Sequence, residues 1–317
     1  MSLFDKRINY KPFEYPEVMD FVDMMNKTFW VHKEIDFTAD IQDFGAQLSS
    51  TEKEVVKRSL LSIAQVEVGV KAFWGDLYKH FPKPEINNLG STFAESETRH
   101  SEAYARLLEV MGLNDSFKDI YSIPIFKKKI DMMDNYMKTN DDIIWKLLFF
   151  VVVIENSSLF SQFANILSFT RFKGYLKNTS NIIAWTSIDE QTHANAGIYL
   201  INKLREEGYI DAKMMEEIKR AVSNYIQYEE ELLDWIYEKG ELSFFTKNDM
   251  LNFMKYRVDD ALVNMGVEKV FHITEDQYRA MIWFDEDVFA NELDDFFAKR
   301  PTAYTKHDKS ITAEDLF

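Results

Sequence analysis

Two short motifs in this chain place a histidine three residues after a glutamate. Glu97-Thr-Arg-His100 and Glu190-Gln-Thr-His193 together use two of only six histidines. On a helix, positions i and i+3 project from one face, so the carboxylate and the imidazole of a motif can bind the same metal ion. One isolated motif is more often an exposed pair on a solvated face, but two of them favour metal binding.

Two further glutamates lie in apolar surroundings. Glu67 is part of IAQVEVGVKAFW, and Glu155 directly follows VVVI with no basic residue within four positions. A buried, ionised carboxylate without a partner costs several kcal/mol. Four such carboxylates in one core would repel one another unless cations intervened, and two divalent ions supply the balancing charge. We therefore predict a dinuclear metal site held by Glu67, Glu97, His100, Glu155, Glu190 and His193.

The order of these ligands supports the same prediction. One Glu from each of two helices, plus Glu-x-x-His from each of two others, is the ligand pattern of ferritin-like dinuclear carboxylate proteins. Oxygen-rich ligation with one imidazole per metal suits iron or manganese, whereas zinc favours more nitrogen or sulfur. The chain has no cysteine, which excludes disulfides and thiolate ligands and fits a reducing cytosol.

Long helices are needed to position these ligands. The first is expected to begin near Ser49, where Ser49…Glu52 and Thr51…Glu54 both have capping-box spacing. Helices of about 30 residues exceed the usual globular length and predict an all-α bundle. The six predicted helices span about 49–80, 85–111, 140 or 141 to just before 174, 178–207, 211–239 and 247–265, several of them ending at a glycine.

Composition narrows the possible functions. A net charge of −16 argues against nucleic-acid binding, which requires clustered Lys and Arg. The N-terminus has no secretory signal pattern, and the most apolar run, residues 147–154, is much shorter than a membrane span, so no membrane insertion is expected. We expect one domain over residues 1–297, followed by a polar tail, 298–317, that has too little apolar content to pack alone.

The residues around the motifs resemble a known family. The segment SETRHSEAY at 96–104, together with DEQTH at 189–193, resembles the small, radical-generating subunit of class I ribonucleotide reductase, over about residues 20 to 300. The more specific part is Tyr104, four residues after the first histidine, since ferritins and desaturases share the ligands but not this spacing. The resemblance implies a ferritin-like bundle, a cytoplasmic homodimer and an oxidised dinuclear centre. That centre passes a one-electron hole to a cysteine of a separate large subunit, which reduces ribonucleoside diphosphates.

The resemblance also assigns roles to other residues. Tyr104 matches the radical-bearing tyrosine of the family. Asp189 matches the aspartate that orients a metal-bound imidazole, here His100, and links it to a tryptophan, here Trp30. The tail is implied to dock on the large subunit, with Tyr304 carrying the radical across. Without the family, Tyr104 and Trp30 would be interpreted as core residues and the tail as a frayed terminus.

Departures from the common family pattern point to a subclass. Glu67 stands where many relatives have aspartate, and Lys71, one turn later, is expected to face the site and attract an anionic oxidant such as superoxide. The alternative for Lys71 is a stem packed in the core with its ammonium on a carboxylate. Leu159 and Phe163 supply the apolar pocket that a radical tyrosine needs, but Thr186 is polar. These features resemble the superoxide-activated dimanganese subclass, so manganese is favoured over iron.

A ferritin-like dinuclear oxidase or oxygenase acting on a small molecule is the main alternative. It would need a substrate channel, and it leaves Trp30, Asp189, Tyr104 and the tail without a purpose.

Overall fold

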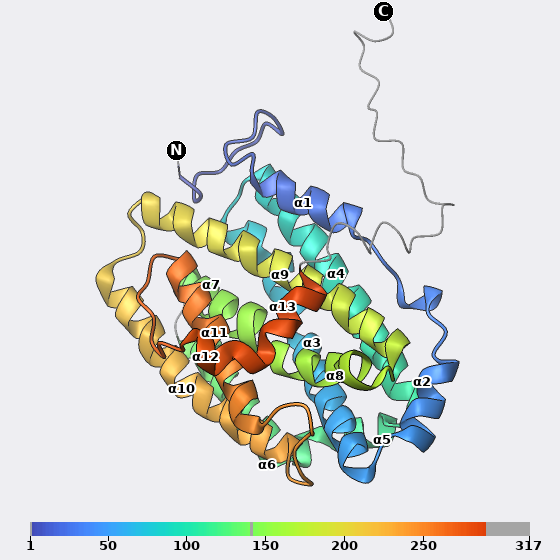
Figure 1. The fold of residues 1–317 in the computed structure, drawn as a ribbon. Helices are drawn as coiled ribbons and strands as arrows, with labels where there is room; N and C mark the ends of the chain where they lie inside the picture. Colours follow the sequence, from blue (N-terminus) through green and yellow to red (C-terminus); the bar gives the residue numbers. More distant parts are fainter. Residues whose placement is uncertain (1, 140–141, 290–317) are drawn as a thin grey trace, which may run out of the picture.

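The computed structural model describes residues 2–139 and 142–289, and this part of the chain is helical throughout, without strands. Long helices lie along one another in a bundle, and the shorter helices cover its ends and one side (Figure 1). The prediction of an all-α fold is therefore confirmed. The main helices are α3 (Ser50–His80), α4 (Pro84–Val110), α7 (Ile143–Phe149), η4 (Phe150–Ser158), α8 (Phe160–Lys173), α9 (Lys177–Glu206), α10 (Ala212–Ile236) and α11 (Lys247–Asn264).

Shorter elements complete the structure. They are α1 (Val18–Lys27), η1 (His32–Glu34), α2 (Thr38–Gln42), η2 (Asp43–Gln47), α5 (Asn114–Lys118), η3 (Ile120–Ser122), α6 (Pro124–Thr139), α12 (Glu275–Tyr278), η5 (Arg279–Met281) and α13 (Ile282–Val288). The tail predicted for residues 298–317 lies outside the described residues.

Local sequence signals account for most helix ends. The Ser49 hydroxyl accepts the backbone N–H of Glu52 while the Glu52 carboxylate accepts that of Ser49, which is the capping box expected at the start of α3. The start of α7 differs from the prediction by one or two residues, because the cap is Asp142, whose carboxylate accepts the N–H of Ile144 at 2.9 Å.

The third predicted helix is not a single regular α-helix. It is divided into α7, η4 and α8, and η4 is a nine-residue π-helix that contains Glu155. A π-turn widens the helix and is often found at functional sites. Helical periodicity alone did not predict this interruption.

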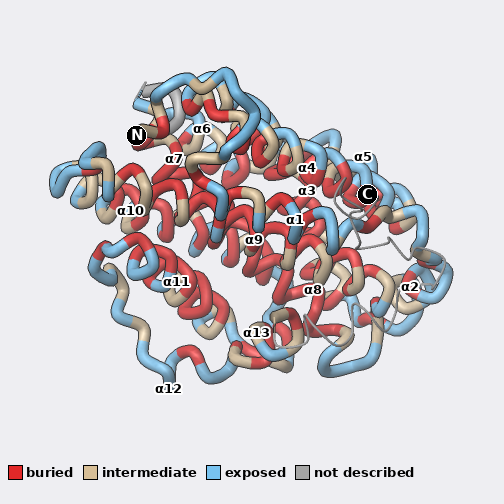
Figure 2. Tube along the Cα trace, turned by 90° about the horizontal axis from the view of Figure 1, so that it is seen from above, coloured by how far each residue is buried: buried red, intermediate tan, exposed pale blue. Residues whose placement is uncertain are grey.

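The apolar stretch is also longer than the eight residues identified from the sequence. Ile143–Lys173 spans 31 residues with a mean hydropathy of 1.8 in its most apolar window, which by length and composition would suffice to cross a membrane. However, 89% of that window is buried inside the protein, as in the core helix of a bundle. Figure 2 shows this interior as buried segments enclosed by partly exposed helices.

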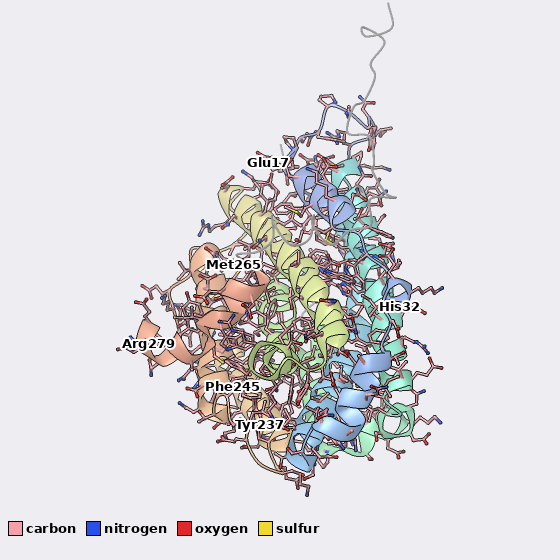
Figure 3. All side chains as sticks on the ribbon, turned by 45° about the vertical axis from the view of Figure 1, so that its right-hand side comes forward. Glu17, His32, Tyr237, Phe245, Met265 and Arg279 are labelled. Carbon is pink, nitrogen blue, oxygen red and sulfur yellow. The ribbon has the colours of Figure 1, made fainter. Side chains whose placement is uncertain are left out.

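Two glycines allow helices to approach closely beside the site. A Cβ at Gly90 on α4 would lie 2.4 Å from the Trp74 carbonyl oxygen on α3, and a Cβ at Gly197 on α9 would lie 2.3 Å from a Val151 methyl on η4. Only glycine avoids these clashes. The α3–α4 and α9–η4 pairs therefore pack closely where their side chains must meet, with α9 between α4 and the C-terminal helices (Figures 1 and 3).

Candidate metal centre

Four helical segments bring the six predicted ligands together in the core. Glu67 lies on α3, Glu97 and His100 on α4, Glu155 on η4, and Glu190 and His193 on α9, and all six are at most 2% exposed. Their donor atoms form two groups, within each of which the atoms lie within 4.8 Å of one another: Glu67, Glu97, His100 and Glu190, and Glu97, Glu155, Glu190 and His193.

Glu97 and Glu190 belong to both groups. The two oxygens of Glu97 lie 3.3 Å from His100 Nδ1 and 3.1 Å from His193 Nδ1. Those of Glu190 lie 3.0 Å and 3.4 Å from the same two nitrogens. Because each carboxylate presents one oxygen to each imidazole, Glu97 and Glu190 are placed to bridge two ions. Glu67 and Glu155 each belong to one ligand group, so each is placed to bind a single ion.

Each imidazole is oriented by a contact at Nε2, the ring nitrogen that faces away from the site. His100 Nε2 lies 3.0 Å from an Asp189 carboxylate oxygen, and His193 Nε2 lies 2.9 Å from the Ser96 hydroxyl, which itself donates to the Phe93 carbonyl. These contacts place Nε2–H outward and leave each Nδ1 facing the site as a ligand. The two positions are therefore unequal, since a carboxylate supports one imidazole and a hydroxyl supports the other.

Trp74 is a functional residue that sequence reasoning missed. Its indole Nε1–H donates to Glu155 Oε1 at 2.9 Å, and its ring is fully buried against Phe93 and His193. One oxygen of Glu155 is thus held by the indole, which leaves Oε2 to face the site. The available signal was spacing, because Trp74 lies seven residues, or two turns, after Glu67 on the same helix face.

Burial and mutual repulsion shift the protonation of this cluster. Burial raises the pKa of Glu67 and of Glu155 well above the ordinary value, and the neighbouring carboxylates add to both shifts. Burial also disfavours the charged form of Glu190, but the imidazoles of His100 and His193 outweigh it and lower the pKa of Glu190. Burial likewise opposes ionisation of the two imidazoles, yet the surrounding carboxylates raise the pKa of His100 and His193.

The donor set fits two hard or borderline divalent ions. Among the described residues, both oxygens of Glu67 and of Glu97, one oxygen each of Glu155 and Glu190, and Nδ1 of both histidines are buried without a hydrogen-bond partner. Buried polar atoms are rarely left unsatisfied, so this convergence is best explained by ions that bind them. The structure places all six residues where our sequence analysis requires them.

We expect metal binding to release protons and to weaken as the pH falls. The raised pKa values of Glu67, Glu155 and both imidazoles favour their protonated forms in the metal-free protein, and an entering ion must displace the protons that are bound. Lower pH strengthens this competition, so affinity should fall by about tenfold per pH unit for each displaced proton. Calorimetric titration with Mn(II) in buffers of different ionisation enthalpy measures the release. Binding without proton release would contradict this assignment.

A hydrogen-bonded chain leads from the site to Trp30 and Arg99. The Trp30 indole Nε1–H donates at 2.9 Å to the Asp189 oxygen that also contacts His100, and the Trp30 and His100 rings stack at 5.7 Å. Arg99, which sequence reasoning did not single out although it lies inside the first motif, donates to the Trp30 carbonyl at 3.2 Å. The contacts expected for Trp30 and Asp189 are present, while their role in radical transfer stays a prediction.

Tyr104 lies in a closed pocket next to the site. Its hydroxyl is buried and has no hydrogen-bond partner of normal geometry among the described residues. The hydroxyl of Thr186 is likewise buried and also has no such partner. Burial and the charge of Glu67 raise the pKa of Tyr104, an effect that Thr186 only partly opposes. Leu159 and Phe163 are also buried.

Lys71 and Tyr304 complete the set of predicted site residues. Lys71 is half-buried on α3 and makes no ion pair with any carboxylate that the structure describes. Its predicted role in attracting an oxidant is neither supported nor contradicted by a contact. Tyr304 lies outside the described residues.

The helical bundle and its buried carboxylate–histidine cluster define a ferritin-like protein with a dinuclear metal site. The solved R2 subunit of ribonucleotide reductase from Clostridium botulinum has this fold, with a TM-score of 0.78 at 17% identity over 86% of this chain and 88% of that one. The dimanganese(II) NrdF of Streptococcus sanguinis is similar, with a TM-score of 0.75 at 18% identity over 87% of this chain and 97% of that one.

Sequence comparison identifies the family. The family described as "Ribonucleotide reductase, small chain" matches residues 7–278, so the chain belongs to the ribonucleotide reductase small-chain family. The protein of Invertebrate iridescent virus 3 named "Probable ribonucleoside-diphosphate reductase small subunit 048L" is 26% identical over 96% of this chain and 86% of its own length. The chain is thus a radical-generating small subunit for deoxyribonucleotide synthesis, and this function is favoured over the oxidase alternative.

Proposed function

We propose that this chain is the small subunit of a ribonucleoside-diphosphate reductase of the superoxide-activated dimanganese subclass. It acts in the cytoplasm as a homodimer, and its C-terminal tail, residues 298–317, docks on the large subunit with Tyr304 in the radical path. The observation that supports the dinuclear centre most directly is the sharing of Glu97 and Glu190 between two buried ligand groups. When bound, the metal pair would supply the one-electron oxidant that the large subunit requires.

The chain's own residues have distinct tasks around that pair. Glu67 and His100 would hold one ion, Glu155 and His193 the other, and Glu97 and Glu190 would bridge them. The absence of bulk water from the core strengthens the electrostatic attraction between ions and carboxylates. Asp189 keeps His100 in the tautomer that leaves Nδ1 free, and it joins that imidazole to Trp30.

The preference for manganese is supported by the surroundings of Tyr104. A tyrosine that gives up an electron must also lose its phenolic proton, and the Tyr104 hydroxyl has no acceptor of normal hydrogen-bond geometry among the described residues. The polar Thr186, and Lys71 one turn after Glu67 in the sequence, where an anionic oxidant would be attracted, are features that resemble the same subclass. The Streptococcus sanguinis protein of the same fold contains manganese.

Metal analysis and EPR test this proposal on protein purified from cells grown without added iron. We expect two manganese ions per chain and no strong tyrosyl signal. Replacing Tyr104 by Phe should leave most of the nucleotide reduction measured with the large subunit, and it should not destabilise the fold because the hydroxyl makes no hydrogen bond of normal geometry. A di-iron centre with a strong tyrosyl signal, abolished in the Phe variant, would end the manganese proposal.

A further inference from the structure

Arg257, on α11, is a buried cation that contacts two segments next to metal ligands. Its Nε donates to the Asn156 carbonyl at 2.7 Å, and its Nη2 donates to Gln191 Oε1 at 2.9 Å. Asn156 directly follows Glu155, and Gln191 directly follows Glu190. One guanidinium from a helix that provides no ligand therefore joins two of the four helical segments that do, η4 and α9.

The contact to Asn156 falls where the backbone needs an outside partner. In the π-helix η4 the regular α-helical ladder is interrupted, so backbone groups must find other hydrogen bonds. The Asn156 side chain donates to the Val151 carbonyl at 3.1 Å, and its own carbonyl accepts from Arg257. Both interactions stabilise the widened turn that presents Glu155 to the site.

The contact to Gln191 acts on the other ligand helix. Gln191 Oε1 accepts from Arg257, and its amide nitrogen donates to Asn195 Oδ1 at 3.1 Å. The Asn195 contact lies within α9 and orients the Gln191 side chain, and the Arg257 contact ties that side chain to α11 directly beside Glu190. The planar guanidinium of Arg257 also lies 3.4 Å over the Phe160 ring, which begins α8.

Burying the charged guanidinium of Arg257 costs free energy, so its contacts in the core must offset that cost or serve a function. Arg257 is only 8% exposed, and burial lowers its pKa to about 10, a shift that the carboxylate of Asp285 opposes, so it remains charged at neutral pH. Desolvating such a group costs free energy that a packed apolar side chain would not. Its planar fork presents donors on separate nitrogens to two acceptors in a fixed geometry, whereas the three donors of a lysine share one flexible nitrogen.

We propose that Arg257 is a positioning residue of the metal centre: by holding the Asn156 carbonyl and the Gln191 side chain together, it fixes the placement of Glu155 and Glu190. This inference concerns ligand geometry, goes beyond the proposed choice of metal, and applies to manganese and iron alike. Glu155 and Glu190 both belong to the ligand group that contains His193, whereas only Glu190 of these two belongs to the group that contains His100. Loss of Arg257 should therefore weaken metal binding more at the position held by His193.

The test compares Arg257→Met with Arg205→Met in the full-length chain. Arg205 is a matched control, because its Nη1 donates to the Met265 carbonyl at 2.6 Å, just after the end of α11 and near no ligand; Met265 is labelled in Figure 3. Mn(II) dissociation constants are measured for both positions by competition with a chelator, and EPR distinguishes coupled from isolated ions. Removing a residue that supports a metal ligand typically lowers metal affinity about 10- to 100-fold. We expect a loss of this size at one of the two metal positions in Arg257→Met and none in Arg205→Met.

Three further variants separate positioning from general stability. Arg257→Lys, which keeps the charge but has its donors on a single flexible nitrogen, should lose less affinity than Arg257→Met. Gln191→Met removes one acceptor and should weaken the same position, and its effect should not add fully to that of Arg257→Met because both break one contact. Gln191→Met also keeps the test valid if Arg257→Met does not fold.

The outcomes distinguish this inference from the proposed function. If folded Arg257→Met and Gln191→Met bind two ions with wild-type constants and wild-type EPR coupling, the positioning role is wrong even when the manganese assignment holds. If the wild-type protein binds two iron ions in preference to manganese, the proposed subclass is wrong, and the same variants still test Arg257 with Fe(II).

Discussion

Replacing Glu97 by glutamine should prevent assembly of the dinuclear centre and abolish nucleotide reduction. Glu97 is fully buried, and its two oxygens face the two imidazole nitrogens that point into the site. An amide removes one of the four negative charges and offers one acceptor oxygen instead of two. Removing one partner of a buried charge cluster costs roughly 3–5 kcal/mol, or about two to four powers of ten in affinity.

The measurement is metal content per chain after dialysis, with EPR of Mn(II)-loaded protein. We expect the coupled signal of a pair to disappear and at most one weakly held ion to remain. Glu102→Gln is the control, since Glu102 lies on the same helix but is exposed and contributes to neither ligand group. If Glu97→Gln retained two coupled ions with unchanged affinity, the bridging position assigned to this residue would be wrong.

The sequence predicted the ligands because burying a carboxylate is expensive. Glu67 and Glu155 stand out in apolar segments, and the two Glu-x-x-His motifs need only helical spacing to converge, so neither inference required tertiary structure. Helix α3 was likewise predicted from Ser49 and its capping box, and the structure confirms that start. Ionisable residues that stand in apolar segments could thus be recognised from the sequence alone.

The residues that support the ligands were not predictable in the same way. Trp74 and Arg257 each have an ordinary place in an amphipathic helix, and only the packing of α3 and α11 against η4 brings them to Glu155 and Asn156. The π-helix was missed because a single widened turn hardly changes the apolar pattern of 147–154, which is buried on all sides. Such features depend on contacts distant in sequence.

Replacing Trp30 by phenylalanine should uncouple the metal centre from the large subunit. Phenylalanine keeps the aromatic packing but lacks the Nε1–H that donates to Asp189, and a benzene ring is much harder to oxidise than an indole. We expect nucleotide reduction in the presence of the large subunit to fall at least about 100-fold, equivalent to about 2.7 kcal/mol of barrier. Metal content and the EPR signal should change little, because the phenylalanine ring can still stack on His100 and Asp189 still contacts His100 Nε2.

Trp185→Phe is the matched control for this variant. The Trp185 ring lies 5.6 Å from that of Trp30 and is only half-buried, and its indole makes no hydrogen bond to Asp189. It should retain near-wild-type activity. A Trp30→Phe variant as active as the control would show that electrons reach the centre by another route.

Asp189→Asn then separates the two roles of the aspartate. Asp189 Oδ2 contacts both the Trp30 indole and His100 Nε2, and an amide oxygen in its place carries no charge to support the imidazole. This variant should lose activity as Trp30→Phe does, and it should also weaken metal binding about 10- to 100-fold at the His100 position. Trp30→Phe affects transfer alone, so a drop in metal affinity that appears only in Asp189→Asn would place the aspartate in both functions. Equal metal affinity in the two variants would limit Asp189 to the link between the centre and Trp30.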